Sequence, residues 1–257
     1  MAGPKEFYDG LASEYHILFE DWWRAAMWHG RVVANLLAAR GVGEHARVLD
    51  CTCGIGTQAL PLAVLGYNVT GTDLSLRSVE RARTEARARG LQIDLEVGDI
   101  RTVREVVVGD FDAVISCDNA LPHLLEDEDL RLAVDNMFAK LRPGGLFLAS
   151  IRDYDRLVQE RPHGEGPRVI DDIRGRRIAF QVWDWTDDGS SYRLHQFLLQ
   201  QDGAAWHTDH FSIIYRALRP PDLVAALRQA GFALAGIHWH EPEESGFFQP
   251  IVTARKA

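Results

Sequence analysis

The stretch "VLDCTCGIGTQALPLA", Val48 to Ala63, decides the fold class. It runs from a short apolar strand that ends at Asp50, through a loop with two glycines, into an apolar helical segment. A strand that passes through a glycine loop into a helix is typical of nucleotide sites in open α/β sheets. The stretch therefore predicts a ligand site at the carboxyl end of this strand and leaves open which ligand binds there.

Apolar strands and helical patterns alternate on the C-terminal side of this stretch. Strands are expected at 46–51, 67–73, 91–99, 111–119 and 143–153, helices at 75–90 and 127–141, and two closing strands at 232–240 and 246–256. Strands that alternate with helices predict a doubly wound sheet with right-handed crossovers. The expected fold is therefore α/β, with a mostly parallel, seven-stranded, Rossmann-like sheet.

Two segments fall outside this rhythm. Residues 1–44 contain two helical patterns, which predict an N-terminal helical lid. Residues 165–217 contain three long strand-like runs separated by "TDDGS" and "QDGA", which are hairpin signals. The sequence thus predicts an inserted antiparallel sheet of three strands that covers the substrate, within a ligand-binding domain made of residues 45–164 and 218–257.

The composition limits the partners. The chain has 257 residues and a net charge of −9, which offers no basic surface for nucleic acid. It has no run of about 20 apolar residues and no apolar leader at its start, so no membrane contact and a cytoplasmic location are expected. Three cysteines, Cys51, Cys53 and Cys117, are too few for a disulfide framework, and no metal site is predicted. A homo-oligomer is left open.

Two ligands suit the glycine loop. Gly54 and Gly56 allow close approach of backbone, and Asp73 follows Gly54 by 19 positions, where its carboxylate can meet a ribose. Both features fit NAD. Asp50 does not fit NAD, because a carboxylate at the strand end repels the pyrophosphate of that cofactor. Asp50 suits the ammonium and sulfonium groups of S-adenosylmethionine. Asp99 ends the third strand, where an adenine amino group is expected.

Four motifs carry a family resemblance. "VLDCTCGIGTQALPLA", "VTGTDLS", "VGDI" and "LRPGGLFL" resemble, in order, the motifs of the class I S-adenosylmethionine-dependent methyltransferases over residues 45–152. Thr52 stands where the usual D-x-G-x-G-x-G loop has its first glycine. The resemblance implies S-adenosylmethionine as cofactor and a set of residues that hold it: Asp50, Cys51, Cys53, Gly54, Gly56, Asp73, Leu74, Asp99, Ile100, Cys117, Asn119 and His123.

A narrower resemblance lies outside these motifs. "YDGLASEYHILFEDW", "CGIGTQAL", "SCDNALPHLL" and "SIRDYDRL" together resemble the glycine and sarcosine N-methyltransferases and related small-amine enzymes. That group closes an N-terminal Tyr, Trp and Arg over the cofactor, and the matching residues here are Tyr8, Tyr15, Trp22 or Trp23, and Arg24 or Arg31. It also implies that Arg152 holds a substrate carboxylate and that Tyr215 lines the substrate site.

The catalytic hypothesis rests on His123, Arg152 and Tyr215. His123 follows the fourth strand, where it accepts a proton, orients the substrate, or only packs. Arg152 either faces the crevice or pairs with an internal acid such as Asp153 or Asp155. The expected activity is methyl transfer to the nitrogen of a small molecule, either an amino acid such as glycine or sarcosine or an amine such as an amino sugar. The alternative is an O- or C-methyltransferase of a secondary metabolite.

Overall fold

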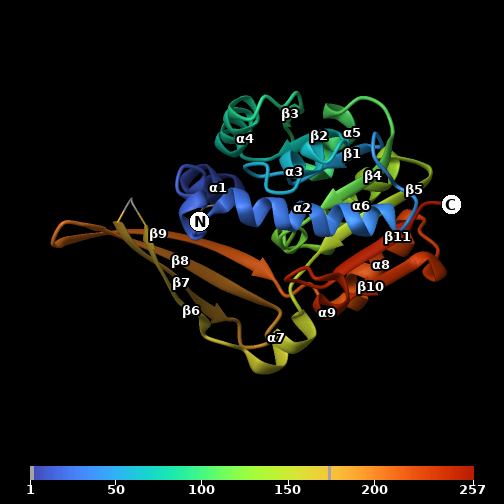
Figure 1. The fold of residues 1–257 in the computed structure, drawn as a ribbon. Helices are drawn as coiled ribbons and strands as arrows, with labels where there is room; N and C mark the ends of the chain where they lie inside the picture. The colour runs from blue at the N-terminus through green and yellow to red at the C-terminus, as the bar shows by residue number, and fades with distance from the viewer. Residues whose placement is uncertain (1–2, 173–174) are drawn as a thin grey trace.

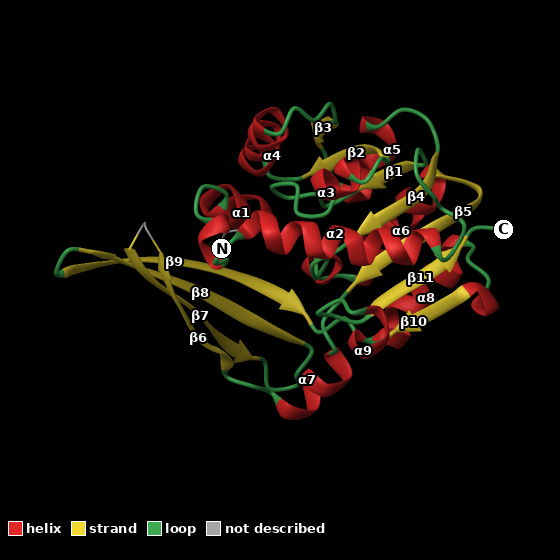
Figure 2. Cartoon of the chain, in the orientation of Figure 1, coloured by secondary structure: helices red, strands yellow, loops and turns green. Residues whose placement is uncertain are grey.

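A seven-stranded sheet forms the centre of the molecule in the computed structural model, which describes residues 3–172 and 175–257 (Figures 1 and 2). Its strands are β1 (Arg47–Asp50), β2 (Asn68–Asp73), β3 (Asp94–Val97), β4 (Phe111–Ser116), β5 (Leu141–Ser150), β10 (Ile237–His240) and β11 (Ile251–Arg255). Their order is β10-β11-β5-β4-β1-β2-β3, and β11 runs antiparallel to both of its neighbours. The remaining pairs are parallel, which confirms the predicted fold class.

Helices cover both faces of this sheet. One face packs against α2 (Trp22–Ala38), α3 (Ala59–Val64) and α4 (Leu76–Ala88), and the other against α5 (Val103–Val106), α6 (Asp127–Lys140) and α8 (Pro220–Ala230). Successive strand residues point to opposite faces of the sheet. Val48 therefore packs in the core under α2, α3 and α4, and Leu49 packs in the core under α5, α6 and α8. The apolar strands seen in the sequence are thus buried on both sides, as parallel strands usually are.

Helix α2 is fixed tightly to the sheet domain. A Cβ atom at Gly30 would lie 2.2 Å from the Cβ of Pro61 in α3, so the two helices approach as closely as backbone allows. Trp22, at the start of α2, is buried and donates through its indole N–H to Thr57 Oγ1 at 3.3 Å. These contacts hold α2 in place beside the glycine loop.

The inserted sheet has four antiparallel strands: β6 (Gly164–Asp172), β7 (Gly175–Trp185), β8 (Ser191–Asp202) and β9 (Ala205–Arg216). The sequence-based prediction of three strands is therefore wrong by one. The missed strand, β6, reads GEGPRVIDD, and its two glycines and one proline are residues depleted in strands. Figure 1 shows that this sheet projects from the main domain below α1.

Short elements link these parts. They are α1 (Pro4–Leu11), η1 (Tyr15–Leu18), η2 (Ile100–Thr102), η3 (Leu121–His123), α7 (Tyr154–Glu160), η4 (Leu234–Gly236) and α9 (Pro242–Ser245). Helix α1 packs between β9 and α4. Its Asp9 accepts hydrogen bonds from Ser75 Oγ at 2.7 Å and from the Arg77 amide at 3.2 Å. The N-terminal segment thus joins the inserted sheet to the edge of the central one.

Over residues 3–172 and 175–257, none of the helices has the length and apolar character that a bilayer crossing requires.

Candidate active site

Two adjoining cavities lie at the carboxyl ends of the parallel strands. The smaller, of about 380 Å³, is bounded by the glycine loop, the ends of β2 and β3 and the η3 turn. The larger, of about 910 Å³, lies between the main domain and the inserted sheet. Tyr8, Tyr15 and Asp118 line both cavities, so the two meet at these side chains.

Asp73 fixes the glycine loop at the smaller cavity. One carboxylate oxygen accepts the Gly54 amide at 2.9 Å and the other accepts the Ser75 amide at 2.9 Å. Gly54 has φ +53°, and a Cβ built on it would meet no atom within 4 Å, so its bare backbone faces open space. Gly56 has another role: its φ is +97°, and a Cβ there would lie 2.6 Å from Leu60 Cγ. Gly56 permits the turn and the packing of α3 without lining the cavity.

Asp50 is fully buried behind the loop. One of its oxygens accepts the Thr52 amide at 3.2 Å, and the other, Oδ2, has no hydrogen-bond partner among residues 3–172 and 175–257. Burial, against the opposing Thr52 hydrogen bond and with the help of the Asp73 and Asp118 charges, raises the pKa of Asp50 to about 8. The carboxyls of Asp50, Asp73 and Asp118 therefore lie close enough to repel one another, which is an environment that favours a positively charged ligand.

The far end of the smaller cavity is closed by ion pairs. Arg101 Nη2 contacts Asp99 Oδ2 at 2.6 Å, and Arg101 Nη1 contacts Asp129 of α6 at 2.9 Å. Burial of Asp99 opposes its charge, but the Arg101 contacts prevail and lower the pKa of that carboxyl. Asp99 lines the cavity as expected, with its oxygens already engaged by Arg101.

Arg152 faces the larger cavity. Its Nη1 donates to Tyr192 OH at 2.6 Å, and its guanidinium lies 4.7 Å from the centre of the Trp183 ring. Its Nη2 is 3.6 Å from Glu165, a half-exposed residue of β6. The neighbouring acids are engaged elsewhere, because Asp153 caps α7 and Asp155 binds Arg219 at 2.7 Å. Arg152 therefore faces the cavity and pairs with an internal acid, but that acid is Glu165 and not Asp153 or Asp155.

Asn119 positions Arg152 through hydrogen bonds of its side chain. Its Oδ1 accepts the Arg152 amide at 2.9 Å, and its Nδ2 donates to Tyr154 OH at 2.9 Å. The Asn119 amide donates to the Ser150 carbonyl at 3.2 Å. These bonds tie the loop after β4 to the end of β5.

Tyr8, His123 and Tyr215 form an aromatic cluster where the cavities meet. Tyr8 OH lies 2.9 Å from His123 Nε2 and 3.5 Å from Tyr215 OH, and the Tyr215 ring is centred 4.2 Å from the imidazole. Burial, together with the Arg152 charge, lowers the pKa of His123 to about 3, and a backbone hydrogen bond with Ile214 opposes the shift. His123 is therefore neutral near pH 7, and a role in hydrogen bonding suits it better than a role as a general base.

Comparison with known proteins identifies the fold and its chemistry. A family described as "Methyltransferase domain" matches residues 48–145. A glycine/sarcosine N-methyltransferase from Parasynechococcus marenigrum is 32% identical over 219 residues, which make up 82% of this chain and 74% of that protein. The chain belongs to the class I S-adenosylmethionine-dependent methyltransferases. Another glycine/sarcosine N-methyltransferase, from Halorhodospira halochloris, is 27% identical over 206 residues, 77% of this chain and 75% of that protein.

Solved structures share the methyltransferase fold over almost the whole chain. DesVI of Streptomyces venezuelae aligns with a TM-score of 0.75 at 18% identity and covers 100% of both chains. CalS10, an amino pentose methyltransferase from Micromonospora echinaspora, aligns with a TM-score of 0.73 at 22% identity and covers 95% of both. These matches include the inserted sheet, so the insert is part of the shared fold.

S-adenosylmethionine is the cofactor of this methyltransferase, and the smaller cavity fits it. Gly54 lines this cavity and leaves room that a side chain would fill. Asp73 offers the remaining lone pairs of a buried carboxylate to the ribose hydroxyls. A sulfonium nucleoside matches this mixture of bare backbone and acid.

The cavities gather most of the residues proposed from sequence. The smaller one is lined by Tyr15, Cys51, Cys53, Gly54, Asp73, Leu74, Asp99, Ile100, Cys117 and His123, and the larger one by Tyr15, Asn119, Arg152 and Tyr215. Asp50 and Gly56 support the loop from behind. Trp23 and Arg31 line neither cavity: Trp23 packs under the Arg89 guanidinium at 3.9 Å, and Arg31 is exposed on α2.

Asp118 and His29 are among the residues of the larger cavity that were not anticipated. Asp118 and Asn119 have φ +58° and +63°, so two consecutive non-glycine residues adopt the left-handed conformation after β4. Such strain gathers at functional sites, and Asp and Asn are the residues that tolerate it best. The adjacent "DN" after a strand was the available signal for Asp118, whereas His29 in the middle of α2 gave none.

Proposed function

We propose that this methyltransferase transfers a methyl group to the nitrogen of a small amine that carries a carboxylate, such as glycine or sarcosine. The observation that carries the proposal is Arg152, a mostly buried guanidinium at the wall of the larger cavity. A planar guanidinium recognises a carboxylate through two parallel hydrogen bonds. The names of the relatives from Parasynechococcus and Halorhodospira support the same substrate class.

The residues of this chain would act mainly by positioning. Bound S-adenosylmethionine supplies an electrophilic methyl group on a sulfonium. Arg152 would fix the carboxylate end of the substrate, and the contact between Tyr8 and His123 would close the wall where the cavities meet. Because the transfer is an in-line displacement, holding the amine in line and excluding water supply most of the rate enhancement.

The test compares substrates with and without a carboxylate. Glycine, sarcosine, glucosamine, methylamine and a phenol are assayed with the wild type, Arg152→Ala and the control Arg156→Ala, an exposed arginine at the rim of the same cavity. For glycine or sarcosine, Arg152→Ala should raise KM by at least ~30-fold, because it removes one partner of a buried charge pair. Binding of S-adenosylhomocysteine should not change. Turnover of the phenol alone would reject the proposal and favour an O-methyltransferase.

A bulkier amine is the second candidate. The larger cavity, at about 910 Å³, lies near the upper end of the usual range for small-molecule sites and exceeds what glycine fills. An amino sugar would use more of this volume. In the same assay, turnover of glucosamine that survives Arg152→Ala would select this candidate and leave nitrogen methylation in place.

A further inference from the structure

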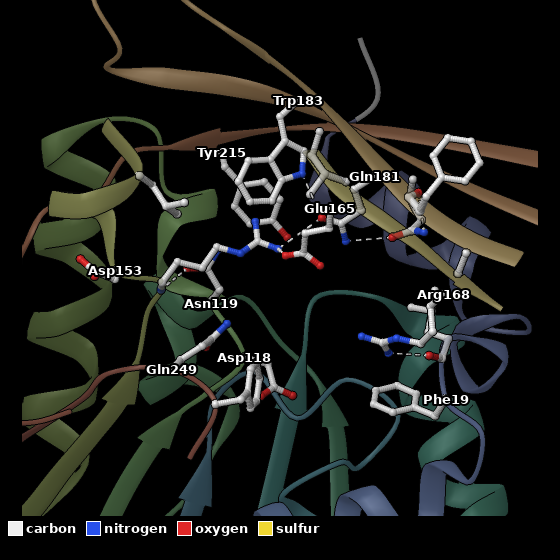
Figure 3. Close-up of a pocket in the computed structure, with 18 of the residues that line it drawn as sticks. Phe19, Asp118, Asn119, Asp153, Glu165, Arg168, Gln181, Trp183, Tyr215 and Gln249 are labelled. Atoms are coloured by element: carbon white, nitrogen blue, oxygen red, sulfur yellow. Dashed lines mark hydrogen bonds and ion pairs between the residues drawn. The ribbon is translucent and has the colours of Figure 1, made fainter. Parts of the chain in front are cut away.

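Asp118 has an unusual position in the site. It lies two residues after the end of β4 and lines both cavities. Its side chain is partly buried, and one buried carboxylate oxygen, Oδ1, has no hydrogen-bond partner in the described part of the chain. Figure 3 shows it at the floor of the larger cavity, across from Glu165, Gln181 and Trp183. An unpaired buried acceptor of this kind costs free energy unless a ligand satisfies it.

The surrounding loop holds this carboxylate rigidly. The Asp118 amide donates to Ser150 Oγ at 2.8 Å, and its other oxygen, Oδ2, accepts Gln58 Nε2 at 3.0 Å. The backbone is in the left-handed conformation, with φ +58°. One oxygen therefore anchors the side chain while the other, Oδ1, has no partner among the described residues, which makes it a preorganised acceptor.

The charges around Asp118 leave a place for a cation. The ionisable groups that interact with it are Tyr15 of η1, His29 of α2, Asp50 of β1 and Cys117 beside it. Burial raises the pKa of Asp118, and the His29 charge and the Gln58 hydrogen bond oppose that rise. Burial likewise lowers the pKa of His29, so the nearest basic group is predominantly neutral. No ion pair joins Asp118 to a basic side chain among residues 3–172 and 175–257.

The geometry points to Asp118 as the residue that binds the substrate ammonium group and removes its proton before methyl transfer. This inference rests on the proposed function and specifies its amine site. With Arg152 on the wall and Asp118 on the floor of the same cavity, an amino-acid zwitterion finds a cation for its carboxylate and an anion for its ammonium. Asp118 also borders the smaller cavity, so an amine there lies next to the cofactor.

The proton balance follows directly. The ammonium transfers one proton to the Asp118 carboxylate, which frees the nitrogen lone pair. That pair forms the new bond to the methyl carbon, and the electrons of the broken methyl–sulfur bond stay on the sulfur of S-adenosylhomocysteine. The methylated amine leaves as a cation, and the Asp118 carboxyl releases its proton to solvent through the open cavity.

Matched ligand pairs test the binding part. Glycine is compared with glycolate, and glucosamine with glucose, by ligand-observed NMR on protein saturated with S-adenosylhomocysteine. The variants are Asp118→Asn, which keeps the shape, the acceptor for Gln58 and a residue type tolerant of the left-handed conformation, and Asp153→Asn as control. Asp153 carries the same change in the same cavity, but its carboxylate caps α7 and points away from the centre in Figure 3.

The wild type and Asp153→Asn should prefer at least one amine over its hydroxyl analogue, and Asp118→Asn should lose that preference by about 10- to 100-fold, the scale of a hydrogen bond to a charged group. For a turned-over amine, the kcat/KM of Asp118→Asn should rise about tenfold per pH unit below the pKa of the amine, while the wild type stays flat there. Unchanged thermal unfolding midpoints would show that the variants fold.

Three results would overturn the inference: no preference for amines by the wild type, a preference retained by Asp118→Asn, or a loss in Asp118→Asn of S-adenosylhomocysteine affinity instead of amine affinity. The last would assign Asp118 to the cofactor. The proposed function fails separately. If amines bind through Asp118 but the methyl group appears on oxygen, nitrogen methylation is rejected and the ammonium site stands.

Discussion

A comparison of Gly54→Ala with Gly90→Ala separates an effect on cofactor binding from an effect on the stability of the fold. Gly54 has φ +53°, and a Cβ on it would project into open space beside the cofactor cavity. Gly90, after α4, has φ +65° and equally open surroundings, but it lines neither cavity. Gly90→Ala therefore carries the same backbone cost without the effect on the ligand.

The magnitudes follow from these two environments. Alanine in the left-handed conformation costs about 1–2 kcal/mol, so each variant should unfold at a temperature lower by roughly 2–8 °C. In Gly54→Ala the added methyl group also occupies space that the cofactor needs. Overpacking of this kind costs about 1–3 kcal/mol, a loss of roughly 5- to 150-fold in affinity.

The assay is calorimetric titration of S-adenosylhomocysteine into the wild type, Gly54→Ala and Gly90→Ala, with thermal unfolding of all three. We expect similar melting temperatures for the two variants and weakened binding only in Gly54→Ala. If Gly54→Ala bound as tightly as Gly90→Ala, the cofactor would not lie against this backbone, and the assignment of the smaller cavity would be refuted.

Three further outcomes follow from the site. Asp73→Asn should weaken S-adenosylmethionine binding by about 10- to 100-fold through loss of a charged acceptor, measured by titration, and an unchanged Kd would remove Asp73 from the ribose contact. The pKa of His123 lies near 3 when folded and near 6.5 when unfolded, so the unfolded chain binds more protons between these values and stability is lost as pH falls below about 6.5. Urea unfolding at pH 7 and 5 should therefore show a loss about 2 kcal/mol smaller in His123→Gln than in the wild type, and equal losses would contradict the burial argument. Hydrogen exchange should slow in residues 4–19 when S-adenosylhomocysteine binds, because Tyr8 and Tyr15 line both cavities, and exchange in α2 should stay constant. Equal protection of residues 4–19 with and without the ligand would reject a lid.

The cofactor half of the site was predictable because its signals are local. Asp50, Asp73 and Asp99 each end or follow a strand, and parallel strands bring their carboxyl ends to one edge. The spacing of Gly54 and Asp73 then matches a hydrogen bond that the fold forms, from the Gly54 amide to the Asp73 carboxylate. A motif of this kind can be read because its members are fixed by one strand–loop–helix unit and its neighbour.

The substrate half was harder because its members come together from distant segments. Tyr8 contacts His123 across 115 positions and Tyr215 across 207, and nothing in the sequence sets these distances. The sequence also did not show which face of α2 is turned toward the core. Trp22 points inward to Thr57, which places Trp23 under Arg89 and leaves Arg31 on the surface. The strand β6 that supplies Glu165 has a composition closer to a loop than to a strand.

Nitrogen methylation of a small amine can be followed through the fate of a labelled methyl group. Wild-type protein is incubated with S-adenosylmethionine carrying a ¹³C-methyl group and with the amine and phenol panel, and the product is examined by NMR. Nitrogen methylation should give an amine product whose ¹³C-methyl group is bonded to nitrogen, together with S-adenosylhomocysteine. A label found only on oxygen or carbon, or no transfer to any amine, would contradict it.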